Sequence, residues 1–188
     1  MSRYPVHTLE SAPERSKPGL EQLQKAFGFL PNIAGAIANS PTLLNSLTGV
    51  FASVHSGSLS EAEIQVCLLT NAVTNASEWP VAFHTTLALQ LGIALEDAQT
   101  IREGKVPSES KLAALSTFAK TLIEKRGHVP SGELDAFLKA GYTQEQALAV
   151  IAISAASTIT NYAATLTDPP LEAQFQQHRW TPFSKQVK

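Results

Sequence analysis

A helix start at Ser60 is the strongest structural signal in the chain. Ser60 and Glu63 have the three-residue spacing at which each side chain can hydrogen-bond to the other residue's backbone amide. Thr143 and Gln146 repeat this capping box, and Ser40 marks a third start because a proline follows it at the first helical position. Apolar residues follow each start at helical spacing. The repetition of this pattern along the chain predicts an all-α fold.

The same signals predict how two of the helices pack. Further helical patterns begin at Leu20 and shortly after Pro107. The segment 78–91 has Pro80 within its first turn, where a missing amide donor is tolerated. We expect helices 60–76 and 78–91 to form an antiparallel hairpin within a bundle of six to eight helices.

The length of 188 residues and the hydrophobic content of 44% suit a single domain with its own core. Residues 1–19 contain three prolines among polar residues, so we expect an extended N-terminal arm before one helical domain at 20–188. The C-terminal tail, 168–188, carries three aromatic residues, Phe175, Trp180 and Phe183. We expect the tail to pack on the core through these side chains.

Charge and composition argue against several classes of function. The formal net charge is -2 with 14 Lys+Arg, so the chain lacks the basic patch that favours nucleic acid. No apolar stretch approaches the roughly 20 residues that span a bilayer, and we expect a cytoplasmic protein without a membrane segment. The histidines form no i, i+4 pair and no Cys/His cluster, and no glycine-rich phosphate loop occurs. Neither a metal nor another cofactor is predicted.

Cys67 is the only cysteine in the chain. One cysteine cannot close an intramolecular disulfide or support dithiol chemistry within one chain. Val66, Leu68 and Leu69 flank Cys67, which is typical of a buried, unreactive thiol. We therefore predict a structural role for it.

Two sets of residues carry a resemblance to a known family. Five positions in the helix pair 59–92 form the first set: Leu59, Ser60, Asn75, His84 and Gly92. The second set lies near the C-terminus: Thr160, Asn161, Tyr162, Asp168 and Trp180. This arrangement resembles the carboxymuconolactone decarboxylase and alkylhydroperoxidase D (AhpD) superfamily. The resemblance implies an AhpD-like helical bundle that assembles as a trimer or hexamer.

The sequence departs from the peroxidase members of that superfamily at the residues that do the chemistry. Ser77 and Pro80 stand where those members have their two cysteines, and Gln65 stands where they have a glutamate. A serine hydroxyl cannot enter a thiol redox cycle, and a glutamine amide does not take up a proton near neutral pH. Of the residues in that relay, only His84 matches. We therefore expect the dithiol peroxidase mechanism to be lost.

His84 is the predicted catalytic residue, because imidazole titrates nearest to neutrality and the resemblance implies a functional histidine here. A hydrogen-bonded core histidine is the alternative. Gln65 is expected to orient a ligand or to be a structural polar residue of its helix. Ser77, Glu78 and Trp79 are expected to line the mouth of a pocket, and Ser77 would ordinarily cap the helix that follows it.

Three functions remain open. The first is a cofactor-free enzyme of the lyase or decarboxylase type, in which His84 transfers protons on a small organic acid or lactone. The second is a non-catalytic binding or assembly protein on the same scaffold, with a pocket filled by side chains. The third is residual peroxidase activity by another route. The helix near 143–165 is rich in small residues, which suits a subunit interface, so we expect a homo-oligomer.

Overall fold

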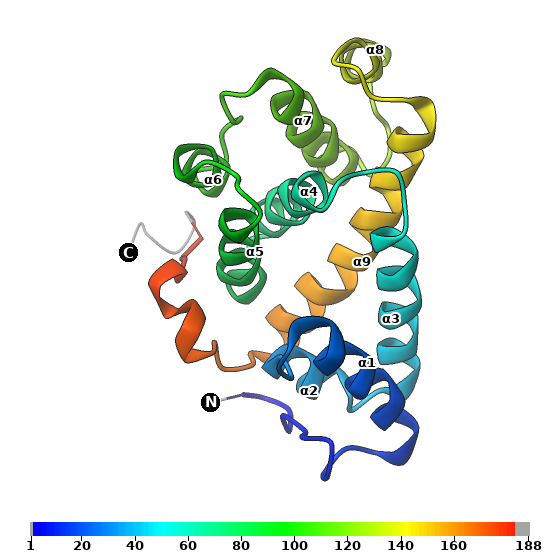
Figure 1. The fold of residues 1–188 in the computed structure, drawn as a ribbon, viewed down its shortest axis with the longest axis vertical. Coiled ribbons are helices and arrows are strands. Elements are labelled where there is room, and N and C mark those ends of the chain that lie inside the picture. The colour runs from blue at the N-terminus through cyan, green and yellow to red at the C-terminus, as the bar shows by residue number, and fades with distance from the viewer. Residues whose placement is uncertain (1, 183–188) are drawn as a thin grey trace.

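The computed structural model describes residues 2–182, and this part of the chain is built from helices (Figure 1). The nine α-helices of the described part are α1 (Lys17–Phe27), α2 (Asn32–Ile37), α3 (Pro41–His55), α4 (Glu61–Thr74), α5 (Glu78–Gln90), α6 (Leu95–Arg102), α7 (Ser110–Glu124), α8 (Ser131–Lys139) and α9 (Gln144–Thr167). Two short 3-10 helices are η1 (Glu14–Ser16) and η2 (Ala173–His178). The predicted all-α bundle is confirmed. The helices exceed the six to eight expected because α2, α6 and α8 are too short to show a clear apolar period.

Helix α4 lies at the centre of the bundle, where it packs against α5, α7 and α9 (Figure 1). One core cluster joins α4, α6, α7, α8 and α9, and it includes the fully buried Ile64, Leu115 and Phe137. A second cluster joins α1, α2, α3 and α5, and it includes Leu20 and Leu44. Helix α9 contributes to both clusters and so ties the two halves of the bundle together.

The helix starts predicted from capping residues are confirmed. The Ser60 hydroxyl accepts from the amide of Glu63 at 3.3 Å, and the Glu63 carboxylate accepts from the amide of Ser60 at 2.9 Å. Thr143 and Gln146 make the same reciprocal pair at 3.1 and 2.9 Å. The Ser40 hydroxyl accepts from an amide in the first turn of α3. These local bonds satisfy helix-end donors that have no partner within the helix.

The extended N-terminal stretch is shorter than the expected 1–19. Helix α1 begins at Lys17, with Pro18 in its first turn, where a missing amide donor breaks no helical hydrogen bond. The stretch before it docks on α2, and the His7 amide donates to the Gly35 carbonyl at 3.1 Å. A Cβ atom at Gly35 would lie 2.5 Å from the His7 carbonyl oxygen, so only glycine permits this close approach.

The C-terminal tail packs on the bundle through its aromatic side chains, as expected. Phe175 is 3% exposed, and its ring meets the ring of Phe83 edge-on at 5.3 Å. Trp180 is 8% exposed, and its indole N–H donates to the Arg102 carbonyl at 3.0 Å. Phe183 lies outside the described residues.

Helix α9 corrects the expectation that no apolar stretch is long enough to span a bilayer. It has 24 residues and a mean hydropathy of 1.5 over its most apolar window. In the described structure 44% of that window is buried, and α9 packs against α3, α4 and α5. Serines, threonines and an asparagine interrupt its apolar run, which is why the sequence does not suggest a span. Length and composition do not separate a buried core helix from a membrane helix, so the apolarity of α9 alone does not indicate a membrane span.

Candidate functional site

A tight turn brings two predicted site residues together. Helix α4 ends at Thr74, two residues before the expected end, and residues 75–77 lead into α5. Ala76 in this turn has a left-handed backbone with φ 53°. Because α5 folds back along α4, Gln65 lies opposite His84, and the Gln65 side-chain oxygen is 2.9 Å from His84 Nδ1.

This contact determines the tautomer of His84. The amide oxygen of Gln65 can only accept a hydrogen bond, so Nδ1 of His84 must carry the hydrogen and donate it. In the neutral ring, Nε2 then holds a lone pair and can only accept. Within residues 2–182 Nε2 has no hydrogen-bond partner. His84 is therefore an oriented imidazole with a vacant acceptor.

Burial keeps this imidazole neutral. His84 is 8% exposed, and burial, with a smaller contribution from the charge of His55, lowers the pKa of His84 to about 3. At pH 7 the ring is therefore uncharged. In this state it can accept a proton or a hydrogen bond through Nε2 but has almost no protonated form available as a donor.

An apolar cavity of about 70 Å³ lies beside His84. Its walls come from α1, α2, α3, α4, α5 and α9, and its aromatic lining consists of Phe27, Phe51, Trp79 and Phe83. A single water needs about 10–15 Å³ of such space, so the cavity has room for about five water-sized groups. The pocket is therefore not filled by side chains, although His84 is hydrogen-bonded within its own core.

A second imidazole lines the same cavity. His55, the last residue of α3, contributes to its wall, and His55 Nδ1 lies 2.7 Å from the Glu61 carboxylate. The ring of His55 also packs on Phe51 at 4.1 Å between centroids. Sequence reasoning missed His55 because its partner, Glu61, belongs to the next helix. The available signal was a histidine one turn after a phenylalanine on the apolar face of α3.

Ser77 does not play the part predicted for it. It occupies the N-cap position of α5, but its side chain makes no capping bond. The Ser77 hydroxyl instead donates to the Asn161 carbonyl of α9 at 3.1 Å, and Ser77 is 1% exposed. Ser77 also does not line the cavity beside His84. Because the Ser77 hydroxyl bonds to the Asn161 carbonyl, it does not cap α5.

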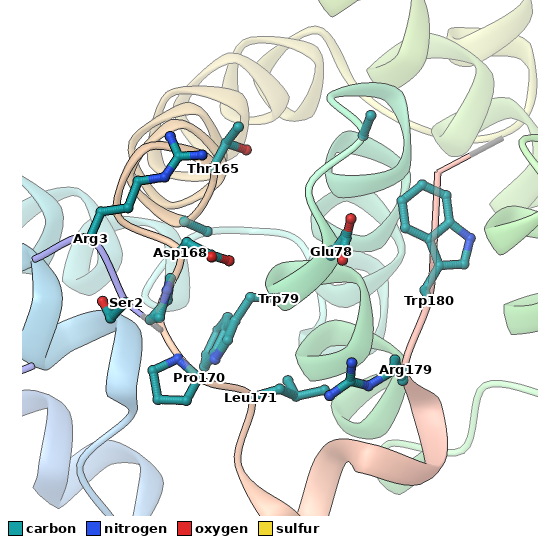
Figure 2. A pocket seen from close by; sticks show the side chains of 13 residues that line it. Ser2, Arg3, Glu78, Trp79, Thr165, Asp168, Pro170, Leu171, Arg179 and Trp180 are labelled. Atoms are coloured by element: carbon teal, nitrogen blue, oxygen red, sulfur yellow. The ribbon is translucent and has the colours of Figure 1, made fainter. Parts of the chain in front are cut away.

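Trp79 and Glu78 occupy different places. Trp79 lines the cavity beside His84, stacks on Phe83 at 4.9 Å, and donates its indole N–H to the Glu172 carboxylate at 3.0 Å. Burial raises the pKa of Glu172, although the hydrogen bonds it accepts oppose that rise. Glu78 points into a separate polar cleft, of which Trp79 forms another part (Figure 2). Of the predicted pocket residues, Gln65 and Trp79 thus contact or flank His84, and Glu78 does not.

Cys67 lies in the core, as predicted. Its side chain is fully buried, and burial raises the pKa of its thiol well above the ordinary value. It does not line the cavity beside His84. Over the described range, moreover, no three His, Cys, Asp or Glu side chains gather closely enough to hold a metal ion.

Comparisons with known proteins identify the fold. No family model and no curated protein matches the chain. A solved structure of an AhpD core, an uncharacterized peroxidase-related protein from Ralstonia eutropha, matches with a TM-score of 0.81 and 21% identity, over 93% of this chain and 94% of that one. The apo debrominase Bmp8 matches with a TM-score of 0.75 and 16% identity over 93% and 94% of the two chains.

Two more solved structures agree. An uncharacterized peroxidase-related protein from a Silicibacter species matches with a TM-score of 0.75 and 16% identity, over 92% of this chain and 94% of that one. A cysteine-to-alanine variant of Bmp8, solved in complex with 2,3,4-tribromopyrrole, matches with a TM-score of 0.73 and 17% identity, over 93% and 94% of the two chains. At these identities the likeness concerns the fold, and the chain has the all-α fold of the AhpD-like proteins.

Proposed function

We propose that the chain is a cofactor-free enzyme that moves a proton on a small, uncharged molecule, with His84 Nε2 as the acceptor. One observation carries the proposal: an imidazole held by Gln65 presents a vacant acceptor at an apolar cavity. A general base must lie within hydrogen-bond reach of the proton that it removes. A molecule in this cavity would meet that requirement.

The lining of the cavity favours a lactone over an ionised organic acid. No lysine or arginine lines it, and the only other ionisable neighbour of His84 there is His55, which is paired with Glu61. Burying a carboxylate without a cationic partner is costly. A lactone carries the same carbonyl chemistry without the charge, so it is the better candidate of the two substrate classes.

The proposed step transfers a proton from the carbon next to the lactone carbonyl to His84 Nε2. The C–H electron pair moves to form an enolate, and the proton returns from His84 to the same or a conjugated carbon. The net reaction is exchange or isomerisation, and it needs no oxidant or reductant.

Deuterium exchange tests this function. Small butenolides would be incubated with the protein in D₂O, and loss of the proton signal next to the carbonyl would be followed by NMR. We expect exchange with the wild type and at least a 100-fold slower rate with His84→Gln. His128→Gln, a substitution of an exposed histidine, is the matched control. An unchanged rate in His84→Gln would remove His84 from the mechanism.

A non-catalytic binding protein is the second candidate, and the low pKa of His84 favours it. An imidazole with a pKa of about 3 is a weak base, and Gln65 offers it no carboxylate to stabilise the positive charge. Such a ring accepts hydrogen bonds well even where it removes protons slowly. In the same experiment, saturable binding of a butenolide without exchange would establish this function instead.

We do not expect hydroperoxide reduction, the third candidate. Cys67 is the only thiol of the chain and is fully buried, outside the cavity beside His84. Consumption of cumene hydroperoxide with a thiol reductant, at a rate that Cys67→Ala leaves unchanged, would show a route that uses neither this thiol nor a second one.

We also propose that the chain forms a homo-oligomer through α9. Four large apolar side chains of α9 are exposed, Leu148, Ile151, Tyr162 and Leu166. Apolar groups at such a density on one helix suggest burial against another subunit. Light scattering after size-exclusion chromatography should give a mass above that of one chain. Leu148→Glu combined with Ile151→Glu should lower this mass, and a monomeric wild type would contradict the proposal.

A further inference from the structure

A polar cleft of about 460 Å³ lies apart from the cavity beside His84 (Figure 2). Four segments that are distant in the sequence form it: the N-terminal stretch, the start of α5, the end of α9, and the tail around η2. Its volume falls within the range of pockets that hold small molecules. Four charged side chains line it, Arg3, Glu78, Asp168 and Arg179.

Asp168 occupies a position that is unfavourable for a negative charge. It follows α9 as the C-cap with a left-handed backbone, φ 50°, which residues other than glycine adopt uncommonly. Its carboxylate stands at the negative end of a 24-residue helix, where a positive group would be favoured. No hydrogen bond or ion pair of this carboxylate occurs within residues 2–182. An unfavourable charge that points into a cleft without a partner suits a cationic ligand group.

Two positively charged guanidinium groups, those of Arg3 and Arg179, also line the cleft. The backbone amide of Arg3 donates to the Thr167 carbonyl at 2.8 Å, which holds Arg3 next to the end of α9, and its guanidinium has no partner in the described part of the chain. Arg179 lies on the other side of the cleft (Figure 2). Its Nε and Nη2 atoms donate to the Gln176 side chain at 3.1 and 2.9 Å, so Nη1 stays available. A guanidinium is well suited to bind a carboxylate.

We propose that this cleft binds an apolar α-amino acid as a zwitterion. The ammonium group would bind the Asp168 carboxylate, and the carboxylate would bind the Arg179 guanidinium. The cleft is also lined by Trp79, Leu171 and Trp180, which offer apolar contact to the side chain of the amino acid. An exposed ion pair contributes only weakly on its own, because water screens the two charges. Both pairs must therefore be present together for useful affinity, which makes the site selective for a zwitterion.

Three molecules with one carbon skeleton separate this proposal from simple ion binding. L-Leucine carries both charges, 4-methylpentanoate lacks the ammonium group, and 3-methylbutylamine lacks the carboxylate. Isothermal titration calorimetry on the full chain, at low ionic strength, should show saturable binding of L-leucine. The affinity for each single-charge analogue should be about 3- to 5-fold weaker. Equal affinities for all three molecules, or no binding of L-leucine and L-phenylalanine, would overturn the proposal.

Two variants test the assigned contacts. Asp168→Asn and Arg179→Gln should each weaken L-leucine binding about 3- to 5-fold. Asparagine tolerates the left-handed backbone as aspartate does, so Asp168→Asn should fold normally, which its thermal unfolding would verify. Asp135→Asn and Arg15→Gln, which change exposed residues outside the cleft, should leave binding unchanged. Full binding by folded Asp168→Asn would refute the ammonium contact. The proposal does not depend on His84, so L-leucine binding should survive His84→Gln.

Discussion

The side chain of Gln65 decides which nitrogen of the His84 ring carries the hydrogen. A carboxylate at this position would also accept from Nδ1, but its charge would stabilise the imidazolium. The amide keeps the orientation of the ring and removes that stabilisation. Because burial already disfavours the charged ring, His84 remains neutral through the physiological range. An amide rather than a carboxylate at position 65 therefore keeps His84 a neutral hydrogen-bond acceptor and does not stabilise the charged ring that a proton relay requires.

Gln65→Glu should raise the pKa of His84. A carboxylate within hydrogen-bond distance favours the charged ring, and such a neighbour typically shifts a pKa by about 1 to 3 units. NMR titration of the His84 ring signals between pH 3 and 8 measures the shift. Gln99→Glu, on the exposed surface of α6, is the control and should leave these signals unchanged. A pKa that stays near 3 in Gln65→Glu would mean that desolvation outweighs the new charge.

Cys67 should be unreactive in the folded protein. The side chain is fully buried and its pKa is raised, so neither access nor thiolate is available. Ellman's reagent at pH 8 should label less than about a tenth of the protein in an hour and all of it in denaturant. Rapid labelling without denaturant would show that the core opens around α4, and it would reopen the thiol route for peroxide chemistry.

At the level of elements, a contact with another helix replaces the capping bond that the sequence predicts at the start of α5. Serine before a helix commonly caps it, and by sequence Ser77 is placed to do so. In the folded chain the carbonyl of Asn161 on α9 lies within reach and takes the hydroxyl instead. The bond therefore joins two helices rather than ending one. The capping boxes of α4 and α9 formed as predicted because both partners of each box lie in the same turn.

Ser77→Ala should destabilise the protein by about 1 kcal/mol. The substitution removes a buried hydrogen bond between α5 and α9, while the Asn161 carbonyl keeps the bond from the Thr165 hydroxyl. Urea unfolding followed by circular dichroism measures the loss. Ser56→Ala, at an exposed site, should change stability by less than about 0.5 kcal/mol. Equal stabilities of the two variants would show that the contact with α9 contributes nothing.

At the level of the whole molecule, the two core clusters meet along α9, and the His84 cavity lies within the cluster formed by α1, α2, α3 and α5. Aromatic rings from α1, α5 and the C-terminal tail surround this region, with Phe27, Phe83 and Phe175 in edge-to-face contact. Protonation of a residue inside this cluster therefore acts on the stability of the whole fold.

Acid should destabilise the protein partly through His84. Its folded-state pKa lies below the unfolded value of 6.5, so between about pH 6.5 and pH 3 the unfolded chain binds more protons at this site. This contribution is complete above pH 6.5 and is lost as the pH falls toward 3. Between pH 7.5 and 5 the loss should be about 2 kcal/mol.

The free energy of unfolding, measured in urea across this pH range, checks that expectation. His84→Gln should be less sensitive to acid than the wild type by this amount, and His128→Gln should follow the wild type. His178, whose pKa is also lowered, chiefly by burial, is present in all three proteins and cancels in the comparison. Parallel curves for the wild type and His84→Gln would contradict the neutral, buried state of His84.

The sequence alone determined the all-α fold, the starts of α3, α4 and α9, and the buried place of Cys67, because these depend on capping and apolar spacing within one or two turns. It also singled out Gln65 and His84. Only the tertiary structure decided that these two side chains bond to each other, that His55 joins them at the cavity, and that Ser77 turns to α9. The charged cleft lined by Asp168 is likewise formed by four segments that are distant in the sequence. Such contacts depend on how helices pack, and no local pattern encodes the distance between side chains on different helices.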